Sequence, residues 1–313
     1  MGVDMRPTLR QIEYFVTVAE LCSFRKAADK LAVTQPSLSK QIQTLEAELG
    51  LSLFERSSRQ VTLSQPGQAL LEDARALLNQ AYGFKAKTRE LRTRQAYHLN
   101  AGVLPSIGAY FMPRFTQRLR SVFPDLQLSF IEGSSQELLG KLAQGEVDFV
   151  IASRGPQADF CTKSLFEETL WICSTPEDDL MQPVEPAPLE ALKGRRLVTL
   201  SPEFHLSEIV AALAQKAGAE LSAEYRGSSL DAIRQIAARS SAVAVLPSLY
   251  ALGEAIRDPA FRVRRLAHPD AIHPVLLYWR RTVRDQAFYE RLAVEIIAEK
   301  MAIRDERAPH LRV

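Results

Sequence analysis

The chain has 313 residues, of which 46% are hydrophobic and 24% are charged, and its formal net charge is +2. This composition is that of an ordinary globular protein of about two domains, which excludes a disordered, collagen-like or low-complexity chain. No stretch is long and apolar enough for a membrane helix, and Asp4, Arg6 and Arg10 interrupt the segment where a signal peptide needs an apolar core. We therefore expect a cytoplasmic protein without membrane contact.

Motifs for catalysis and cofactor binding are missing. None of the 14 glycines has a second glycine two positions on, which excludes the dinucleotide fingerprint G-x-G-x-x-G. Gly140 and Gly145 have P-loop spacing, but Glu146 and Val147 follow where that motif needs Lys and Ser or Thr. The histidines and cysteines also lack the spacing of metal ligands. The sequence predicts no enzyme activity, no catalytic residue, no cofactor and no metal.

Three short helices are expected at the start of the chain. Thr8 and Gln11 form a capping box in front of an apolar stripe, and residues 24–31 follow as a second helix after a short break. Thr34 opens a third helix, which ends at Gly50 because glycine accepts the left-handed conformation at a helix C-terminus. The spacing places Leu38, Ile42, Leu45 and Leu49 on the buried face of that helix.

The opposite face of the third helix is polar. Its short hydrogen-bonding side chains and its one lysine can bond base edges and phosphates in a major groove. The alternative is that the polar side chains only face solvent, since any amphipathic helix has a polar face. Residues 51–56 and 60–63 are expected as two short strands around residues 57–59, and this hairpin carries Arg56 and Arg59. This order of elements is typical of a winged helix-turn-helix: two helices, a turn, a third helix with a polar face, and a hairpin. The polar face comprises Gln35, Ser37, Ser39, Lys40 and Gln43.

This segment resembles the DNA-binding domain of LysR-type transcriptional regulators. The matching pieces are SFRKAADKL, VTQPSLSKQI, LEAELGLSLFER and TLSQPG. The resemblance implies that Gln35, Pro36 and Ser39 lie against bases. It also implies that a second set lies near phosphates or the minor groove, namely Arg25, Ser37, Lys40, Arg56 and Arg59.

A long helix is expected from Pro66 to about Arg94, with Ser64 as its cap. Its apolar residues alternate spacings of four and three, which is the pattern of a coiled-coil seam. A partner chain is the simplest cover for such a stripe, so we expect a dimer, or a dimer of dimers, on a dyad-symmetric DNA site. The seam consists of Leu70, Ala74, Leu77, Ala81, Phe84, Thr88 and Leu91. The expected domains are 1–66 for DNA binding, 67–95 for dimerisation and 96–313 for effector binding.

The remainder alternates strands and helices. This order predicts an α/β architecture of two lobes, resembling a periplasmic binding protein, with parallel strands and helices on both faces. Ligands of such folds bind at strand C-termini and helix N-termini. Strands are expected at 99–103, 126–131, 147–152, 170–174, 196–200, 223–227, 243–246 and 275–279, and helices include 107–123, 136–144 and 285–300.

Polar residues mark several of these strand ends. Helix N-termini with free N–H groups favour an anionic or strongly accepting ligand, although a serine at such a place is also an ordinary helix cap. Arg154 and Arg226 also follow strands, where a surface charge explains them equally well. The expected effector residues are Ser106, Ser135, Phe204, His205, Ser228 and Ser229.

This second part resembles the effector domain of the LysR family, and within it the peroxide-sensing OxyR branch. The resembling segments are GVLPSIGAYFMPRF, FPDLQLSFIEGSSQELLGKLAQGEVDFVI, LFEETLWI and GSSLDAIRQIAARSSAVAVLPS. That branch works through a peroxidatic and a resolving cysteine, and the matching positions here hold His205 and Ala214. Its disulfide chemistry is therefore not available to that pair. Cys173 is expected inside a strand as an inert thiol, and Cys161 in a loop.

The sequence thus predicts a DNA-binding regulator controlled by a small polar or anionic effector, bound without oxidation of the protein. Its expected partners are double-stranded DNA, the effector and further copies of itself, with RNA polymerase as a candidate. The alternative is a thiol-based oxidative-stress regulator using Cys161 or Cys173. A small-molecule binding protein without DNA function is more remote, and an enzyme comes last.

Overall fold

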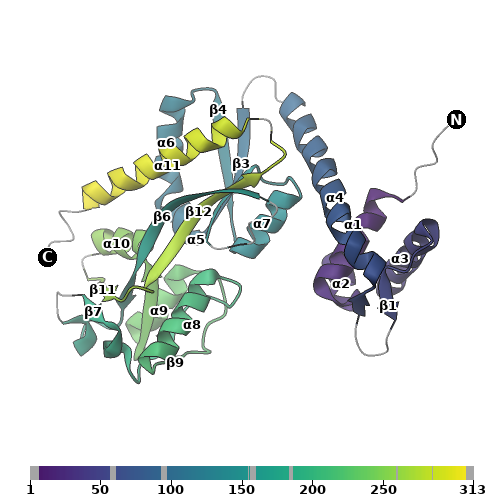
Figure 1. The fold of residues 1–313 in the computed structure, drawn as a ribbon. Helices are drawn as coiled ribbons and strands as arrows, with labels where there is room; N and C mark the ends of the chain where they lie inside the picture. The colour runs from purple at the N-terminus through teal and green to yellow at the C-terminus, as the bar shows by residue number, and fades with distance from the viewer. Residues whose placement is uncertain are drawn as a thin grey trace. The chain divides into compact units, whose positions relative to one another are not determined.

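The computed structural model describes residues 7–56, 61–92, 97–153, 155, 160–182, 186–258, 260–283 and 285–307. The chain divides into two compact units, Met1–Thr88 and Arg89–Val313. Figure 1 shows both units with their labelled elements.

The first unit is built on three helices whose ends match the sequence signals. Thr8 and Gln11 form the expected capping box, Thr34 caps the third helix through the N–H of Ser37, and Gly50 ends that helix at φ 64°. Ala27 and Ala28 are buried, so the second helix packs closely against its neighbours. The helices are α1 (Leu9–Leu21), α2 (Phe24–Lys30) and α3 (Gln35–Leu49).

The wing is attached to the end of α3. Strands β1 (Phe54–Arg56) and β2 (Val61–Leu63) pair antiparallel, while residues 57–60 between them lie outside the described part. Glu46 fastens this hairpin by accepting the N–H groups of Leu53 and Phe54 at 2.8 and 3.2 Å. Leu49, expected in the core, is 37% exposed because the core ends one turn earlier, at Leu45.

The helix that follows packs partly on its own unit. It is α4 (Gln65–Arg92), and a Cβ at Gly67 would lie 2.1 Å from the carbonyl oxygen of Leu53, so only glycine permits this close approach. Ala74 and Leu78 are buried against α1–α3, and the Tyr82 hydroxyl donates to Glu13 at 2.9 Å. The expectation that the whole seam faces a partner chain is therefore wrong for Ala74. Leu77 and Phe84 of the same stripe are 48% and 72% exposed.

The second unit contains one mixed sheet that passes through two lobes. Its main path is β4-β3-β5-β12-β6-β10-β8-β9, with β11 beside β6 and β7. Strands β3, β4 and β5 are parallel to one another, and so are β8, β9 and β10, as expected. The prediction of wholly parallel sheets is wrong for β6 and β12, which run antiparallel to each other along nine residue pairs. β12 is also antiparallel to β5, and β6 is antiparallel to β10 and β11. Figure 1 shows these two long strands crossing from one lobe to the other. They are β6 (Phe160–Cys173) and β12 (Ile272–Arg280).

Lobe I surrounds the first part of the sheet. Its apolar core lies between the strands and the helices α5, α6 and α11, and α7 covers a smaller cluster that includes Leu138 and Tyr278. Phe111 ends α5 and begins α6, so the single helix expected at 107–123 is two helices. The elements are β3 (Tyr97–Val103), α5 (Pro105–Tyr110), α6 (Met112–Val122), β4 (Leu126–Glu132), α7 (Ser135–Ala143), β5 (Phe149–Ala152) and α11 (Gln286–Arg307).

Lobe II has its own buried core of strands and helices. The strand expected at 223–227 is wrong: the chain is irregular there, and the edge strand β9 lies earlier, at Glu220–Leu221, where it pairs with β8. The elements are β7 (Ala187–Pro188), β8 (Arg196–Val198), α8 (His205–Ala217), β9, α9 (Leu230–Arg239), β10 (Ala242–Pro247), α10 (Ser248–Arg257) and β11 (Arg264–Ala267), with short 3₁₀ turns at Asp179–Met181 and Leu189–Leu192.

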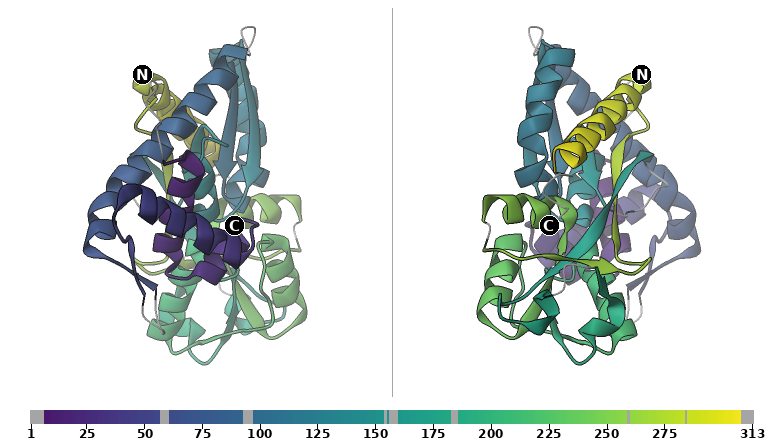
Figure 2. Two further views of the ribbon diagram at one scale, coloured as in Figure 1. Left: turned by 90° about the vertical axis from the view of Figure 1, so that its right-hand side faces the viewer. Right: turned by 90° about the vertical axis from the view of Figure 1, so that its left-hand side faces the viewer.

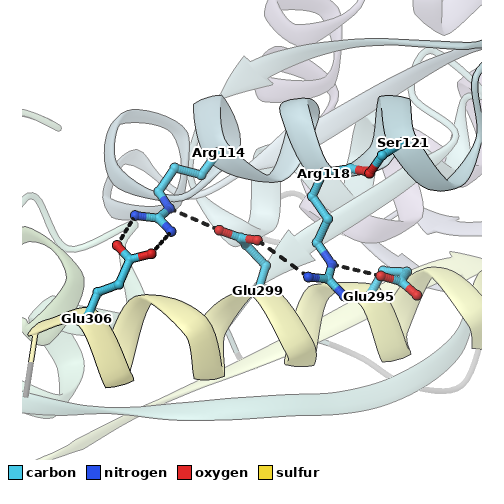
Figure 3. Close-up of polar contacts among 6 residues, drawn as sticks. All are labelled: Arg114, Arg118, Ser121, Glu295, Glu299 and Glu306. Atoms are coloured by element: carbon cyan, nitrogen blue, oxygen red, sulfur yellow. Dashed lines mark hydrogen bonds and ion pairs between the residues drawn. The ribbon is translucent and has the colours of Figure 1, made fainter.

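Ion pairs fasten α11 to α6. Arg114 and Arg118 of α6 alternate with three glutamates of α11, as Figure 3 shows. Glu299 is buried and receives Arg114 at 3.0 Å, and Arg118 reaches Glu295 at 2.8 Å. Arg114, Arg118 and Glu299 each have two partners in this chain, so each of these three side chains loses its conformational freedom once for two contacts. Figure 2 shows α11, in yellow, lying across lobe I.

Candidate DNA-binding face and effector cleft

The polar face of α3 is accessible. Gln35, Pro36, Ser37, Lys40 and Gln43 are exposed and Ser39 is half-buried. Leu38, Ile42 and Leu45, on the other side of the helix, are 0%, 2% and 1% exposed, and they hold α3 against α1 and α2. The helix therefore presents a row of amides and hydroxyls with one ammonium group, which is the chemistry that reads base edges and phosphates.

Three cations were expected beside this helix. Arg25 is exposed on α2. Arg56 is the last residue of β1, but its side chain lies outside the described residues, and so does Arg59.

In the second unit, a cavity of about 20 Å³ lies between the two lobes. This volume accommodates about one water molecule, so the lobes are closed around it. Its lining is mostly apolar, and three polar side chains interrupt it, from Ser106, His205 and His273. The full lining is Leu104, Pro105, Ser106, Leu200, Phe204, His205, Leu206, Leu230, Pro247 and His273.

His205 joins lobe II to lobe I. It is the first residue of α8, and its Nδ1 lies 2.5 Å from the Ser153 hydroxyl at the end of β5. The N–H of Ser153 in turn donates to the Ser135 hydroxyl at 3.3 Å, and the Tyr278 hydroxyl donates to the Ser153 carbonyl at 2.9 Å. This tie holds the start of α8 against the strand ends of lobe I.

A buried carboxylate lies behind the cavity. Glu168 of β6 is fully buried, and its Oε1 accepts the N–H of Leu249 at 2.8 Å. Its Oε2 lies 3.5 Å from Nδ1 of His273, directly across the strand pair, and 3.4 Å from the Ser106 hydroxyl. Burial acts to raise the pKa of Glu168, but His273, Lys300 and the Leu249 amide outweigh it and hold that pKa below its usual range.

The other expected effector residues lie around this centre. Phe204 lines the cavity, whereas Ser135 is buried at the start of α7 and is not a lining residue. Its hydroxyl bonds Ser153, which in turn bonds the lining residue His205. Ser228 and Ser229 are exposed and are not among the lining residues, and Ser229 caps α9. Arg226 is exposed, and Arg154 lies outside the described residues.

The cysteines are placed apart. Cys161 is the second residue of β6, so the loop expected there is wrong: the strand is longer than its apolar end suggested. Cys173 ends the same strand, is 1% exposed, and burial raises its pKa to about 12. At about 3.3 Å per residue the two are roughly 40 Å apart, so no disulfide can join them within the folded chain.

No helix in the described part of the chain is long and apolar enough to cross a membrane. The described residues also hold no group of three or more His, Cys, Asp or Glu side chains arranged to bind a metal ion.

Two family models match the chain. One is the LysR substrate binding domain, over residues 92–300, and the other is the bacterial regulatory helix-turn-helix protein of the lysR family, over residues 9–68. The chain belongs to the LysR family. It is a LysR-type DNA-binding regulator with an effector-binding domain, and the members of this family are transcription regulators rather than enzymes.

Similar proteins extend over nearly the whole chain. The dual regulator OxyR of Escherichia coli is 31% identical over 291 residues, which cover 93% of this chain and 95% of OxyR. A variant of full-length OxyR from Pseudomonas aeruginosa matches in structure with a TM-score of 0.60 and 29% identity, covering 93% of this chain and 95% of the other. Full-length CbnR complexed with its target DNA shares the fold, with a TM-score of 0.54, 23% identity, and coverage of 94% and 99%.

Three residues of the cleft are missing from the sequence expectations: Ser153, Glu168 and His273. Ser153 directly follows the strand predicted at 147–152 and could have been found by the rule that marked Ser106. Glu168 and His273 gave no signal, because they meet only through the pairing of two strands more than 100 residues apart in the sequence.

Proposed function

We propose that this LysR-type regulator binds a dyad-symmetric duplex through α3 and the wing. The exposed polar face of α3 is the observation that carries this proposal. Gln35, Pro36 and Ser39 contact bases, and Gln43 belongs to the same DNA-facing side of the helix. The phosphates or the minor groove are contacted by Arg25, Ser37, Lys40, Arg56 and Arg59. The proposed domains are 1–66 for DNA binding, 67–95 for dimerisation and 96–313 for effector binding, and the family models over residues 9–68 and 92–300 support the first and the third.

The chain acts as a dimer, or as a dimer of dimers, in the cytoplasm. Leu77 and Phe84 of α4 are exposed apolar side chains seven residues apart, which is the spacing of a coiled-coil contact with a second copy. RNA polymerase is a further partner of the DNA-bound form.

The effector is a small polar or anionic molecule in the interlobe cavity. Ser106 and His205 are its polar contacts, with Phe204 as an apolar wall, and Ser135 supports the site through Ser153. Binding changes the orientation of the lobes and, through it, the spacing of the DNA-binding heads. The 20 Å³ volume favours a ligand of few atoms.

The thiol-based alternative has less support from the described residues. It would use Cys161 or Cys173, but the latter is buried and the two are at opposite ends of one strand. His205 and Ala214 replace the cysteine pair on which the OxyR resemblance would depend.

Selection of binding sites from a random duplex pool tests the proposed function. We expect the purified full-length chain to enrich one sequence with dyad symmetry, and its affinity to fall steeply with salt because phosphate contacts release counterions. Retention of all duplexes without sequence enrichment would contradict a sequence-specific regulator.

A further inference from the structure

One side of α11 carries an exposed apolar stripe. Val294 and Met301 lie seven residues apart and are 61% and 59% exposed, and Ala298 between them is half-buried. Residues seven positions apart lie on the same side of an α-helix, two turns from each other. Large apolar side chains aligned in this way, with charged residues at both ends, are typical of a surface that contacts another protein.

The remaining sides of α11 are occupied within the chain. Ile296 and Ile303 are buried in the core of lobe I. Glu295 and Glu306 point to α6, where they meet Arg118 and Arg114 (Figure 3). The stripe is therefore on the side of α11 that faces neither the core nor α6. We call it, with the charged residues at its ends, the outer face: Glu290, Arg291, Val294, Met301, Arg304 and Asp305.

The charges of the outer face are arranged in opposite order at its two ends. Glu290 and Arg291 stand before the stripe, and Arg304 and Asp305 stand after it. All four side chains are exposed. The face is thus self-complementary: each charge at one end matches a charge of opposite sign at the other end when a second helix of the same sequence runs antiparallel.

Two of these charges also have contacts within lobe I. Glu290 pairs with Lys163 at 3.0 Å, and the guanidinium of Arg291 lies 5.8 Å from the ring centre of Phe123. Lys163 and Glu290 are about half exposed, so their pair is weak. A carboxylate accepts several hydrogen bonds and a guanidinium donates five, which leaves both groups able to take a further partner.

A single two-fold axis satisfies the whole outer face. In an antiparallel pair Val294 lies opposite the partner's Met301. Residues fourteen positions apart share one edge of the face, and the axis brings like edges together. Glu290 therefore lies beside the partner's Arg304, and Arg291 lies beside the partner's Asp305. The midpoints of these three pairs all fall between residues 297 and 298. Parallel pairing would instead place each charge beside its own copy, which is repulsive.

We propose that the outer face of α11 contacts a second copy of this chain, antiparallel around a two-fold axis near residues 297 and 298. Two large apolar side chains per copy are few for a stable interface, so the contact forms between copies that α4 already holds at high effective concentration. The inference rests on the proposed association through α4, and it adds a contact made by the effector unit. Since α11 packs in lobe I, this contact joins lobe I of one copy to lobe I of another.

Cysteine cross-linking of the full-length chain tests this register. A C22S, C161S background removes the two accessible thiols and keeps Cys173, which is buried. V294C with M301C then supplies two thiols about 10 Å apart along one helix, too far for a disulfide within the chain. In the antiparallel pair, each of them lies next to the other thiol of the partner. We expect mild oxidation to link two chains about tenfold faster than with V294C or M301C alone, because each single thiol lies about 10 Å from its own copy.

Charge reversal in the cross-linking chain tests the pairing of the ends. D305R places arginines opposite each other and should slow the cross-link about fivefold, and R291D with D305R exchanges the two charges and should restore it. E190R, which reverses an exposed carboxylate in lobe II, is the control and should leave the rate unchanged. All of these variants change exposed side chains rather than core residues.

Equal rates for the double and the single cysteine variants would overturn the proposal and leave the outer face to a different protein. A double reversal that links no faster than D305R would overturn it as well. Sedimentation of the same preparations reports the dimer through α4 separately. A chain that sediments as a dimer but links no faster than the single variants therefore loses only the α11 contact, and the proposed function stands.

Discussion

Gln35 stands one residue after the Thr34 cap, at the end of α3 that a major groove receives first. Its amide can donate and accept at once, which is the pattern that matches adenine. Leu38, three residues on, is fully buried and fixes the rotation of the helix. The exposed amide is thus presented by a rigid element, and this is the condition for a contact that discriminates between bases.

We expect Q35A to relax sequence preference at one base pair per half-site. The binding free energy for the preferred duplex should weaken by about 1–3 kcal/mol, with little change for random duplexes. The reason is that base contacts determine sequence specificity, whereas phosphate contacts only position the protein on the duplex. Q41A is the matched control, since Gln41 is exposed about half a turn round the helix from Gln43. Competition binding with both duplex types measures the difference. Unchanged discrimination in Q35A would remove α3 from base reading.

Single residues also mark the limit of sequence reasoning in the cleft. Ser106 and His205 were predicted because each directly follows a strand or opens a helix, and rules for such positions are local. His273 lies in the middle of a strand, and its partner Glu168 is 105 positions earlier in the chain. Only the register of β6 against β12 brings these side chains together, and hydrophobic periodicity does not encode register between distant strands.

At the scale of elements, signals that depend on neighbours in the sequence were reliable. The capping box of α1, the Thr34 cap and the Gly50 terminus of α3 all lie where the sequence placed them. The first ten residues of β6 were missed, because FCTKSLFEET mixes charged and apolar residues on a strand whose burial alternates irregularly. Two segments predicted as strands show the contrast. Residues 223–227 are irregular in the structure, whereas the strand predicted at 147–152 contains β5, which pairs with both β3 and β12.

Helix α4 divides its apolar stripe between two surfaces. Ala74 packs on its own unit, while Leu77 and Phe84 remain exposed. Two large apolar side chains one heptad apart on a helix of 28 residues are expensive to leave in water.

Replacing both exposed residues should therefore abolish dimerisation. L77D with F84D would place two carboxylates in the interface, at a cost of several kcal/mol in association. N79D, which adds a carboxylate about half a turn from Leu77, is the control and should leave the dimer intact. Sedimentation velocity distinguishes the species. A double variant that sediments like the wild type would refute this interface.

At the scale of the whole effector unit, the two lobes meet at more than the hinge strands. Tyr110 of α5 donates to Glu254 of α10 at 2.6 Å, and Tyr250 of α10 donates to Asp231 of α9 at 2.5 Å. Burial, with the neighbouring carboxylates, raises the pKa of both tyrosines, so both remain protonated donors. The starts of α5 and α9 line the cavity, and these contacts connect both helices to α10. Closure of the cleft is thus held at two places.

The tie between His205 and Ser153 is the part of this closure that a ligand can reach, because His205 lines the cavity while Ser153 belongs to lobe I. S153A removes this hydroxyl and should reduce the free energy that favours the closed lobes by about 1 kcal/mol. The population with open lobes should then be about fivefold larger. Hydrogen exchange should then accelerate about fivefold at the amides of residues 104–108 and 204–208, and should stay unchanged in α6 and α11, which their own ion pairs hold together. S129A is the control, because Ser129 bonds Asn100 and His98 on β3, within lobe I. If S153A and S129A exchange alike at the cleft, closure does not depend on the His205 contact, and the lobes are held by the hinge strands and by the contact between Tyr110 and Glu254.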